Sequence, residues 1–168
     1  MREFDNADAL VKSVGQEVAV SAWVEVEQHA IDQFADATGD HQWIHVDPER
    51  AKRESPFGAP VAHGFLTVSL IPALLQQSVN IAQRMGLNYG LNKVRFPAPV
   101  PAGSRVRARF TIQAVDQLGD AAQQAPSGGV AQQAPAAAIS QVTWVITMEC
   151  EGSEKPVCIA ELITRHYH

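Results

Sequence analysis

An aspartate and a histidine lie close together in segment 39–45, which reads GDHQWIH. A carboxylate and an imidazole that converge on one small volume could hold a water molecule, remove its proton and return a proton elsewhere. General acid–base catalysis of this kind accelerates a reaction by about 10²–10⁴-fold, and histidine suits it because its unperturbed pKa of about 6.5 lies near working pH. The sequence therefore offers Asp40 and His45 as a candidate catalytic pair.

The spacing of these two residues alone favours a simpler explanation. Aspartate after glycine is common turn chemistry, so Asp40 could cap a turn. His45 could then be a hydrogen-bonded histidine of the core. More than spacing is needed to choose between the two explanations.

A second candidate group is the backbone amide of Gly64, at the start of an apolar segment that begins at His63. The first N–H groups of a helix lack partners and carry partial positive charge, and glycine lets a carbonyl approach closely. We therefore consider the Gly64 N–H as an oxyanion donor, a role worth about 2.7–4 kcal/mol in a transition state. A glycine that only allows close helix packing is the alternative.

A metal site is a further alternative, because the chain places several ligand-type side chains near one another: Asp40, His41, His45, Asp47 and His63. We expect His41 and His45 to lie on a loop, where side chains four residues apart need not converge. The sequence has neither an HExxH pattern nor a cysteine pair at ligand spacing. We therefore expect no metal and no redox cofactor.

Hydrophobic periodicity predicts the elements that must position these groups. Residues 18–26 alternate as a strand, and residues 27–38 have helical spacing that Gly39 ends. A short helical turn starts at Pro48. The segment from His63 to about Ala82 is apolar almost all round at its beginning, which is typical of a buried helix, and Pro72 should kink or break it. Further strands are expected at 87–96, 105–114, 141–149 and 156–164. This order indicates an α+β protein, a curved sheet around a buried helix.

Two segments fall outside that pattern. Residues 119–138 are rich in Ala, Gln, Gly and Pro and contain AQQAP twice, so we expect a flexible low-complexity insertion there. The C-terminal residues 165–168 are expected to fray.

Composition narrows the classes of protein. The 168 residues, 46% of them hydrophobic, suit one domain spanning residues 1–168. A net charge of −5 argues against nucleic acid as the main partner. No signal peptide or membrane span is evident, so we expect a cytoplasmic protein without a membrane partner. Cys150 and Cys158 are too few for a disulfide framework.

Three stretches resemble the MaoC-like dehydratase family, the (R)-specific enoyl-CoA hydratases also called hydratase 2. They are Phe34 through Ala51, with Gly39-Asp40, His45 and Ala51 in register; Ala62-His63-Gly64-Phe65; and Tyr89 through Val100, a strand ending in a Pro-rich turn. Gln42 and Trp43 replace the commoner Asn-Pro, which resembles a nodulation-protein-N-like branch. Pro72 stands where other members offer a polar side chain near the site.

The resemblance implies the hot-dog fold, in which a curved antiparallel sheet wraps around a long buried central helix, and a homodimer with acyl chains entering near the interface. It implies that Asp40 and His45 activate water for syn addition across a trans-2-enoyl-CoA thioester, giving (R)-3-hydroxyacyl-CoA, while the Gly64 N–H binds the thioester oxyanion. We also expect substrate contacts from Gln42, Trp43, His63 and Phe65. Coenzyme A would be only the handle of the substrate.

Two other functions share this fold. A hot-dog acyl-CoA thioesterase usually places its carboxylate on the central helix, and no Asp or Glu occurs between Val61 and Tyr89. A non-catalytic acyl-CoA-binding module would keep the fold without turnover, against which the retained Asp40 and His45 argue. The basic residues at 93–109 could meet an anionic ligand, but we favour their being the wet face of a strand.

Overall fold

The computed structural model describes the whole chain except residues 121–137. Its elements follow one another as β1 (Arg2–Phe4), α1 (Ala7–Val11), β2 (Glu17–Val20), β3 (Val24–Val26), α2 (Gln28–Thr38), α3 (Trp43–Val46), α4 (Pro48–Glu54), α5 (Gly64–Ser69), α6 (Ile71–Ser78), β4 (Val79–Ile81), β5 (Met85–Arg95), β6 (Ser104–Asp120), β7 (Ala138–Cys150) and β8 (Cys158–Tyr167). The expected insertion at 119–138 lies outside the described residues, apart from its ends in β6 and β7.

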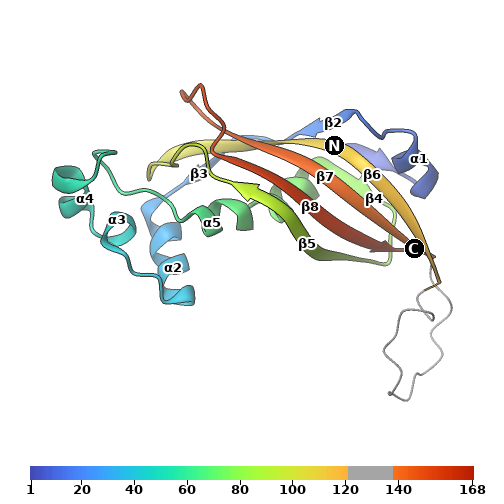
Figure 1. Ribbon diagram of the computed structural model, residues 1–168, viewed down its shortest axis with the longest axis horizontal. Coiled ribbons are helices and arrows are strands. Elements are labelled where there is room, and N and C mark those ends of the chain that lie inside the picture. The colour runs from blue at the N-terminus through green and yellow to red at the C-terminus, as the bar shows by residue number, and fades with distance from the viewer. Residues whose placement is uncertain (121–137) are drawn as a thin grey trace, which may run out of the picture.

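One antiparallel sheet forms the body of the molecule, with strand order β2-β6-β7-β8-β5 and β3 paired to β6. Figure 1 shows these strands curving together along the length of the molecule. In β7 and β8 alternate side chains are buried, as expected when one face of a sheet covers a core. Trp144 and Phe110 are fully buried on that face and meet edge to face, with ring centroids 6.5 Å apart.

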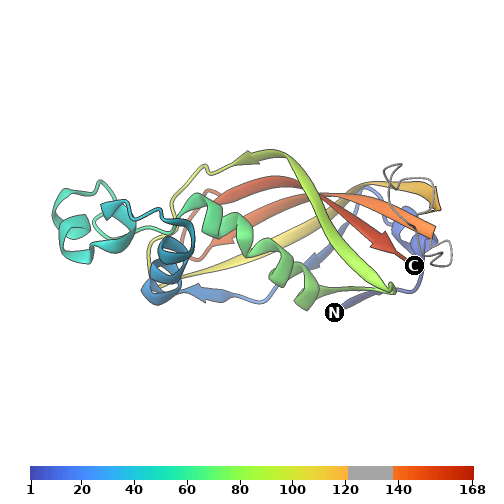
Figure 2. The same cartoon turned by 90° about the horizontal axis from the view of Figure 1, so that it is seen from below.

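Helices α5 and α6 lie along the concave face of the sheet, and β5 descends beside them (Figure 2). Leu66, Ile71, Leu74 and Leu75 are buried there and join the same core as the inward residues of β6, β7 and β8. Burial of such side chains contributes about 1.5–3 kcal/mol each, which fixes the helices to the sheet. The predicted α+β hot-dog fold, a curved sheet around a buried helix, is confirmed.

The buried helix is interrupted where the sequence predicted. Helix α5 ends at Ser69, and α6 begins at Ile71 with Pro72 in its first turn. Proline has no N–H to continue the helical ladder. Its predicted end near Ala82 is wrong, because the chain extends at Val79 and forms β4, which pairs in parallel with β1. The β-branched Val79 and Ile81 are both buried in that strand, and such residues favour extended structure.

Three other expectations need correction. The strand predicted over 18–26 is two strands. Between them the Ser21 hydroxyl, and not a backbone carbonyl, accepts the hydrogen bond from the Ala108 N–H of β6, at 2.9 Å. Strand β1 and helix α1, which Asn6 caps through the Ala9 N–H, were not predicted. The C-terminus does not fray: it completes β8, between β5 and β7, and His166 is buried.

The basic side chains of β6 lie on the outer face of the sheet, as favoured from the sequence. Arg107 and Arg109 both bond to Glu149, and Arg105 pairs with Glu151. Hydrogen bonds from Arg109 and Arg107 hold the pKa of Glu149 below its ordinary value. These cations therefore have partners within the protein.

The two cysteines and the lengths of the helices bear on the expectations about disulfides and membrane spans. Cys150 and Cys158 are both free and buried, and burial raises the pKa of the Cys158 thiol to about 11. Outside residues 121–137, none of the helices has the length and apolarity needed to cross a bilayer.

Candidate active site

The candidate site lies where the chain passes between helices α2, α3 and α5, beyond one end of the sheet (Figure 1). Helix α2 ends at Gly39, which takes a positive φ of 78° and turns the chain so that Asp40 follows at once. His45 is on α3 and not on a loop, which corrects the sequence expectation. The short helix turns its ring inward, where it is buried.

The backbone fixes the orientation of the His45 ring. Its Nδ1 lies 2.6 Å from the Val61 carbonyl oxygen, which can only accept a hydrogen bond. The neutral ring therefore carries its proton on Nδ1 and leaves Nε2 as a proton acceptor. The Gln28 side chain supports this arrangement, since its Nε2 donates to the His45 carbonyl oxygen at 2.7 Å and to Asp32 at 2.8 Å.

The Asp40 side chain is open to solvent and lightly held. Its Oδ1 accepts from the Gln42 N–H at 3.4 Å, and its own N–H donates to Thr38 Oγ1 at 3.4 Å. Long hydrogen bonds such as these leave most of the carboxylate free to bind a water molecule or substrate.

His63 joins the pair. Its Nε2 donates to the Asp40 carbonyl oxygen at 2.9 Å, and its ring stacks on His45 with centroids 3.7 Å apart and planes inclined by 26°. Phe34 covers the other side at 5.0 Å. One ligand-type atom from each of Asp40, His45 and His63 lies within 4.8 Å of the other two. The structure thus brings the predicted pair together and adds a third group.

These three side chains are the described residues that best approach a metal-binding cluster. The tautomers that the backbone imposes leave His45 Nε2 and His63 Nδ1 as possible ligand atoms. Lone pairs of stacked imidazoles lie in nearly parallel planes, however, and so do not converge on one ion. The arrangement fits proton transfer better than tetrahedral coordination.

Gly64 is the first residue of α5, directly after His63. Its N–H has no acceptor among the described residues, as expected at a helix start. A Cβ at this position would lie 2.9 Å from two ring carbons of Phe96, so the ring can pack this closely only against a glycine. Both residues line a hollow of about 360 Å³ together with Thr67 and Phe57. The oxyanion role stays a prediction, and the packing role has direct support.

The other predicted substrate contacts lie around this centre. Gln42 is exposed beside Asp40, and Trp43 is half-buried with the Arg50 guanidinium 4.4 Å from its ring centroid. Phe65 is 73% exposed. Their contacts with substrate stay predictions. The sequence offered His63 as a possible metal ligand and as a substrate contact but not as a hydrogen-bond partner of the Asp40 backbone, and it gave no signal for Gln28 or the Val61 carbonyl.

Comparison with known proteins identifies the family of the chain. Residues 9–130 match the MaoC like domain. The 3-hydroxyacyl-thioester dehydratase Z of Mycobacterium tuberculosis is 47% identical over 167 residues, which cover 99% of either chain. Nodulation protein N of Rhizobium leguminosarum bv. viciae is 43% identical, over 98% of this chain and 92% of the relative.

A solved structure supports the fold. The unliganded R-hydratase from Pseudomonas aeruginosa superposes with a TM-score of 0.64 at 19% identity, over 91% of this chain and 81% of that one. The family match covers most of the chain, and the two relatives align nearly end to end, across the segments that carry Asp40, His45 and Gly64. This chain is a hydro-lyase that belongs to the MaoC-like dehydratase family.

Proposed function

We propose that this protein is an (R)-specific enoyl-CoA hydratase, which adds water across a trans-2-enoyl-CoA thioester to give (R)-3-hydroxyacyl-CoA. The observation that carries the proposal is the Asp40–His45 pair: a carboxylate oxygen and a ring nitrogen lie within 4.8 Å of each other, and the Nδ1 hydrogen bond leaves His45 Nε2 as a proton acceptor. The name of the mycobacterial dehydratase describes the reverse direction of the same reversible chemistry. The (R) configuration rests on the resemblance of segment 34–51 to hydratase 2.

The reaction follows from these positions. Water bound between the Asp40 carboxylate and His45 Nε2 loses a proton to the pair, and its oxygen forms a bond to C3. The electron pair of the double bond moves toward the thioester, whose developing oxyanion accepts a hydrogen bond from the Gly64 N–H. A proton from the pair then adds to C2. Water is thus consumed whole, and no redox change occurs.

We propose that this reaction needs neither a metal nor an organic cofactor. Charge develops only on the thioester oxygen, which one N–H can stabilise, and both proton transfers are within reach of a carboxylate and an imidazole. Metal analysis of the purified protein and assay after dialysis against a chelator test this. Loss of activity that Zn²⁺ or Mg²⁺ restores would contradict it.

A homodimer is part of the proposal. Strand β5 is the edge of the sheet, is 11 residues long and exposes Met85, Leu87, Tyr89 and Leu91. A long apolar edge is a template for pairing with another strand. We propose that a second copy of the chain pairs there, so that acyl chains enter near the interface.

The alternative functions have less support. A thioesterase would need a carboxylate on the central helix, and α5 and α6 contain neither Asp nor Glu. A non-catalytic module would gain nothing from a His45 tautomer with Nε2 kept free. Release of free thiol from acyl-CoA would favour the thioesterase, and tight binding without turnover would favour the module.

The deciding experiment is hydration of crotonyl-, hexenoyl- and octenoyl-CoA, followed as loss of enoyl-thioester absorbance. A stereospecific dehydrogenase assigns the product. Asp40→Asn and His45→Gln should each lower kcat/KM by about 10² or more. The nearby exposed residues Asp36 and His41 provide matched controls, Asp36→Asn and His41→Gln, which should retain activity. No wild-type turnover, (S)-product, or full activity in both catalytic variants would refute the proposal.

A further inference from the structure

A series of hollows follows helices α5 and α6 away from Gly64. The first is lined by Gly64, Thr67 and Phe96. The second shares no lining residue with the first; it is lined by Val68, Ser69 and Pro72 across from Asn88 and Leu91, and its surface is mainly apolar. The third shares Pro72 and Asn88 with the second and continues to Gln76. With a helical rise of about 1.5 Å per residue, the third hollow begins roughly 12 Å from Gly64 and reaches roughly 18 Å.

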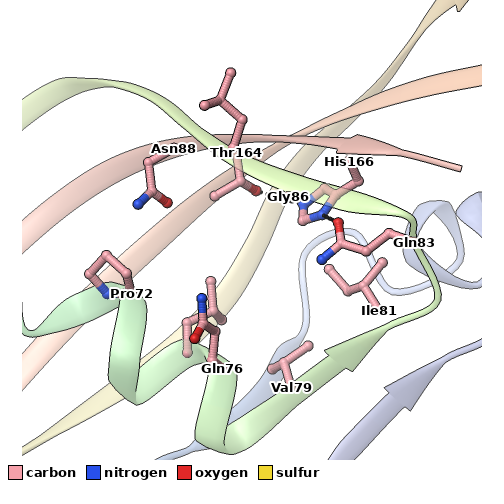
Figure 3. A pocket seen from close by; sticks show the side chains of 11 residues that line it. Pro72, Gln76, Val79, Ile81, Gln83, Gly86, Asn88, Thr164 and His166 are labelled. Carbon is pink, nitrogen blue, oxygen red and sulfur yellow. Dashed lines mark hydrogen bonds between the residues drawn. The ribbon is translucent and has the colours of Figure 1, made fainter. Parts of the chain in front are cut away.

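The third hollow differs from the second in its chemistry. Along β8 the inward side chains change from Ala160 and Leu162 to Thr164 and His166, both of which are 4% exposed. Figure 3 shows Gln76 rising from α6 and Asn88 descending from β5 on either side of the space. Burying hydroxyl and imidazole groups costs free energy unless they are hydrogen-bonded, so Thr164 and His166 need partners within the wall.

The hydrogen bonds in the wall run in one direction. Trp144 Nε1 donates to Thr164 Oγ1 at 2.8 Å, and Thr164 lies 2.7 Å from His166 Nε2. His166 Nδ1 lies 2.6 Å from Gln83 Oε1. Burial lowers the pKa of His166 to about 4, so its ring is neutral and its one proton, on Nδ1, goes to Gln83. Thr164 must then donate to His166 Nε2. This series of hydrogen bonds ends at the Gln83 side-chain amide, whose nitrogen is left to donate.

That amide nitrogen has room because residue 86 is glycine. A Cβ on Gly86 would lie 2.9 Å from Gln83 Nε2. Among the described residues, no hydrogen-bond acceptor is placed on this nitrogen, and the side-chain amides of Gln76 and Asn88 have no protein partner either; all three residues are exposed, so water reaches these amides. The hollow therefore presents several amide groups that can donate or accept, and its lining carries no charged side chain.

We propose that this hollow is the distal end of the acyl channel and that it selects acyl chains bearing an uncharged oxygen group, a hydroxyl or a ketone, far from the thioester. The inference rests on the proposed function, because the thioester end must first be bound at Asp40 and His45. A fully saturated hydrocarbon end would displace water from the amides without replacing its hydrogen bonds. A carboxylate end would meet no cation.

The test uses pairs of trans-2-enoyl-CoA substrates, from hexenoyl to dodecenoyl, that end in either a methyl or a hydroxyl group. Wild type should prefer the hydroxylated member about three- to tenfold in kcat/KM once the chain is long enough to reach the hollow. Asn88→Leu and Gln76→Met, which keep shape and remove the amide, should abolish that preference. Gln77→Met is the matched control, because Gln77 is exposed on α6 as Gln76 is but lies outside the lining.

Crotonyl-CoA separates failure of this inference from failure of the proposed function. It is too short to reach the hollow, so wild type and all three variants should hydrate it equally. Hydration of crotonyl-CoA with a preference for methyl ends, or a hydroxyl preference unchanged in both amide variants, would overturn the inference alone. If no substrate turns over, the affinities of saturated acyl-CoAs with and without the distal hydroxyl decide, and equal affinities overturn it.

Discussion

The rings of His45 and His63 stack at 3.7 Å, yet their hydrogen bonds tie them to different parts of the backbone. His45 bonds to the Val61 carbonyl through Nδ1, and His63 bonds to the Asp40 carbonyl through Nε2. His63 therefore holds the residue that carries the carboxylate at a fixed distance from the ring that accepts the proton. It is a positioning residue, linking the start of α5 to the turn after α2.

Removing this link should lower catalysis without weakening substrate binding. His63→Leu loses the donor to the Asp40 carbonyl, so we expect kcat to fall about tenfold or more with KM nearly unchanged. His63→Gln places an amide donor close to the position of Nε2 and should recover much of that loss. Steady-state kinetics on both variants check this, with urea unfolding to confirm that they fold. Equal losses in both variants would show that the ring stack matters and the hydrogen bond does not.

The contact between Gly64 and Phe96 leads to a second prediction. In Gly64→Ala the new methyl group would lie 2.9 Å from ring carbons of Phe96, which is 42% exposed and can swing outward. We expect a stability change below about 1 kcal/mol, because alanine also favours the helix. We expect kcat/KM to fall about tenfold, because the displaced Phe96 ring would change the hollow next to the Gly64 N–H.

The double variant Gly64→Ala, Phe96→Ala tests the cause of that fall. Removing the ring leaves room for the methyl group, so the double variant should be no worse than Phe96→Ala alone. Thermal unfolding and kinetics of the three variants form a double-mutant cycle. Strictly additive losses would show that the methyl group disturbs the site without involving Phe96.

Much of this site could be predicted from the sequence because its chemistry is local. Gly39 marks the end of a helix, Asp40 follows it directly, and His45 is only five residues further on. The fold was predictable for a similar reason, since the strands at 105–114 and 141–149 alternate cleanly and the helix after His63 is apolar almost all round.

What the sequence could not predict depends on contacts between distant segments. Gln28 reaches the His45 carbonyl from another helix, and the Val61 carbonyl sets the His45 tautomer through the backbone, which has no sequence signal. The C-terminal RHYH looked like a frayed end because its polar residues gave no strand pattern. His166 can be buried because its two ring nitrogens form hydrogen bonds with Thr164 and Gln83. Only the folded sheet brings these three residues together.

The exposed edge of the sheet leads to a third prediction, about assembly. If a second copy pairs along β5, a charge in the middle of that strand should weaken the dimer, because an unpaired lysine would be buried there. Leu91→Lys should shift the protein toward monomer in sedimentation velocity. Ile159→Lys is the control, since Ile159 is about equally exposed on β8, away from the edge. A monomeric wild type, or a dimer unaffected by Leu91→Lys, would contradict the proposed interface.

The buried His166 should make stability fall as the solution becomes acidic. Burial, with a smaller contribution from His168, lowers its pKa from 6.5 to about 4 in the folded protein. Between these values the unfolded chain takes up a proton that the folded protein refuses, so the free energy of unfolding decreases as pH falls through this window. The loss approaches roughly 3 kcal/mol near pH 4 and is absent above about pH 6.5.

Urea unfolding at pH 8, 6.5, 5.5 and 4.5 measures this dependence. The surface carboxylates Glu149 and Glu151, whose pKa values lie below 4.5, contribute mainly at lower pH, so the chosen range isolates His166. His166→Gln should flatten the curve even if it lowers stability at pH 8, whereas His29→Gln, at an exposed position on α2, should leave the slope unchanged. A slope that survives in His166→Gln would mean that another group takes up the proton on unfolding.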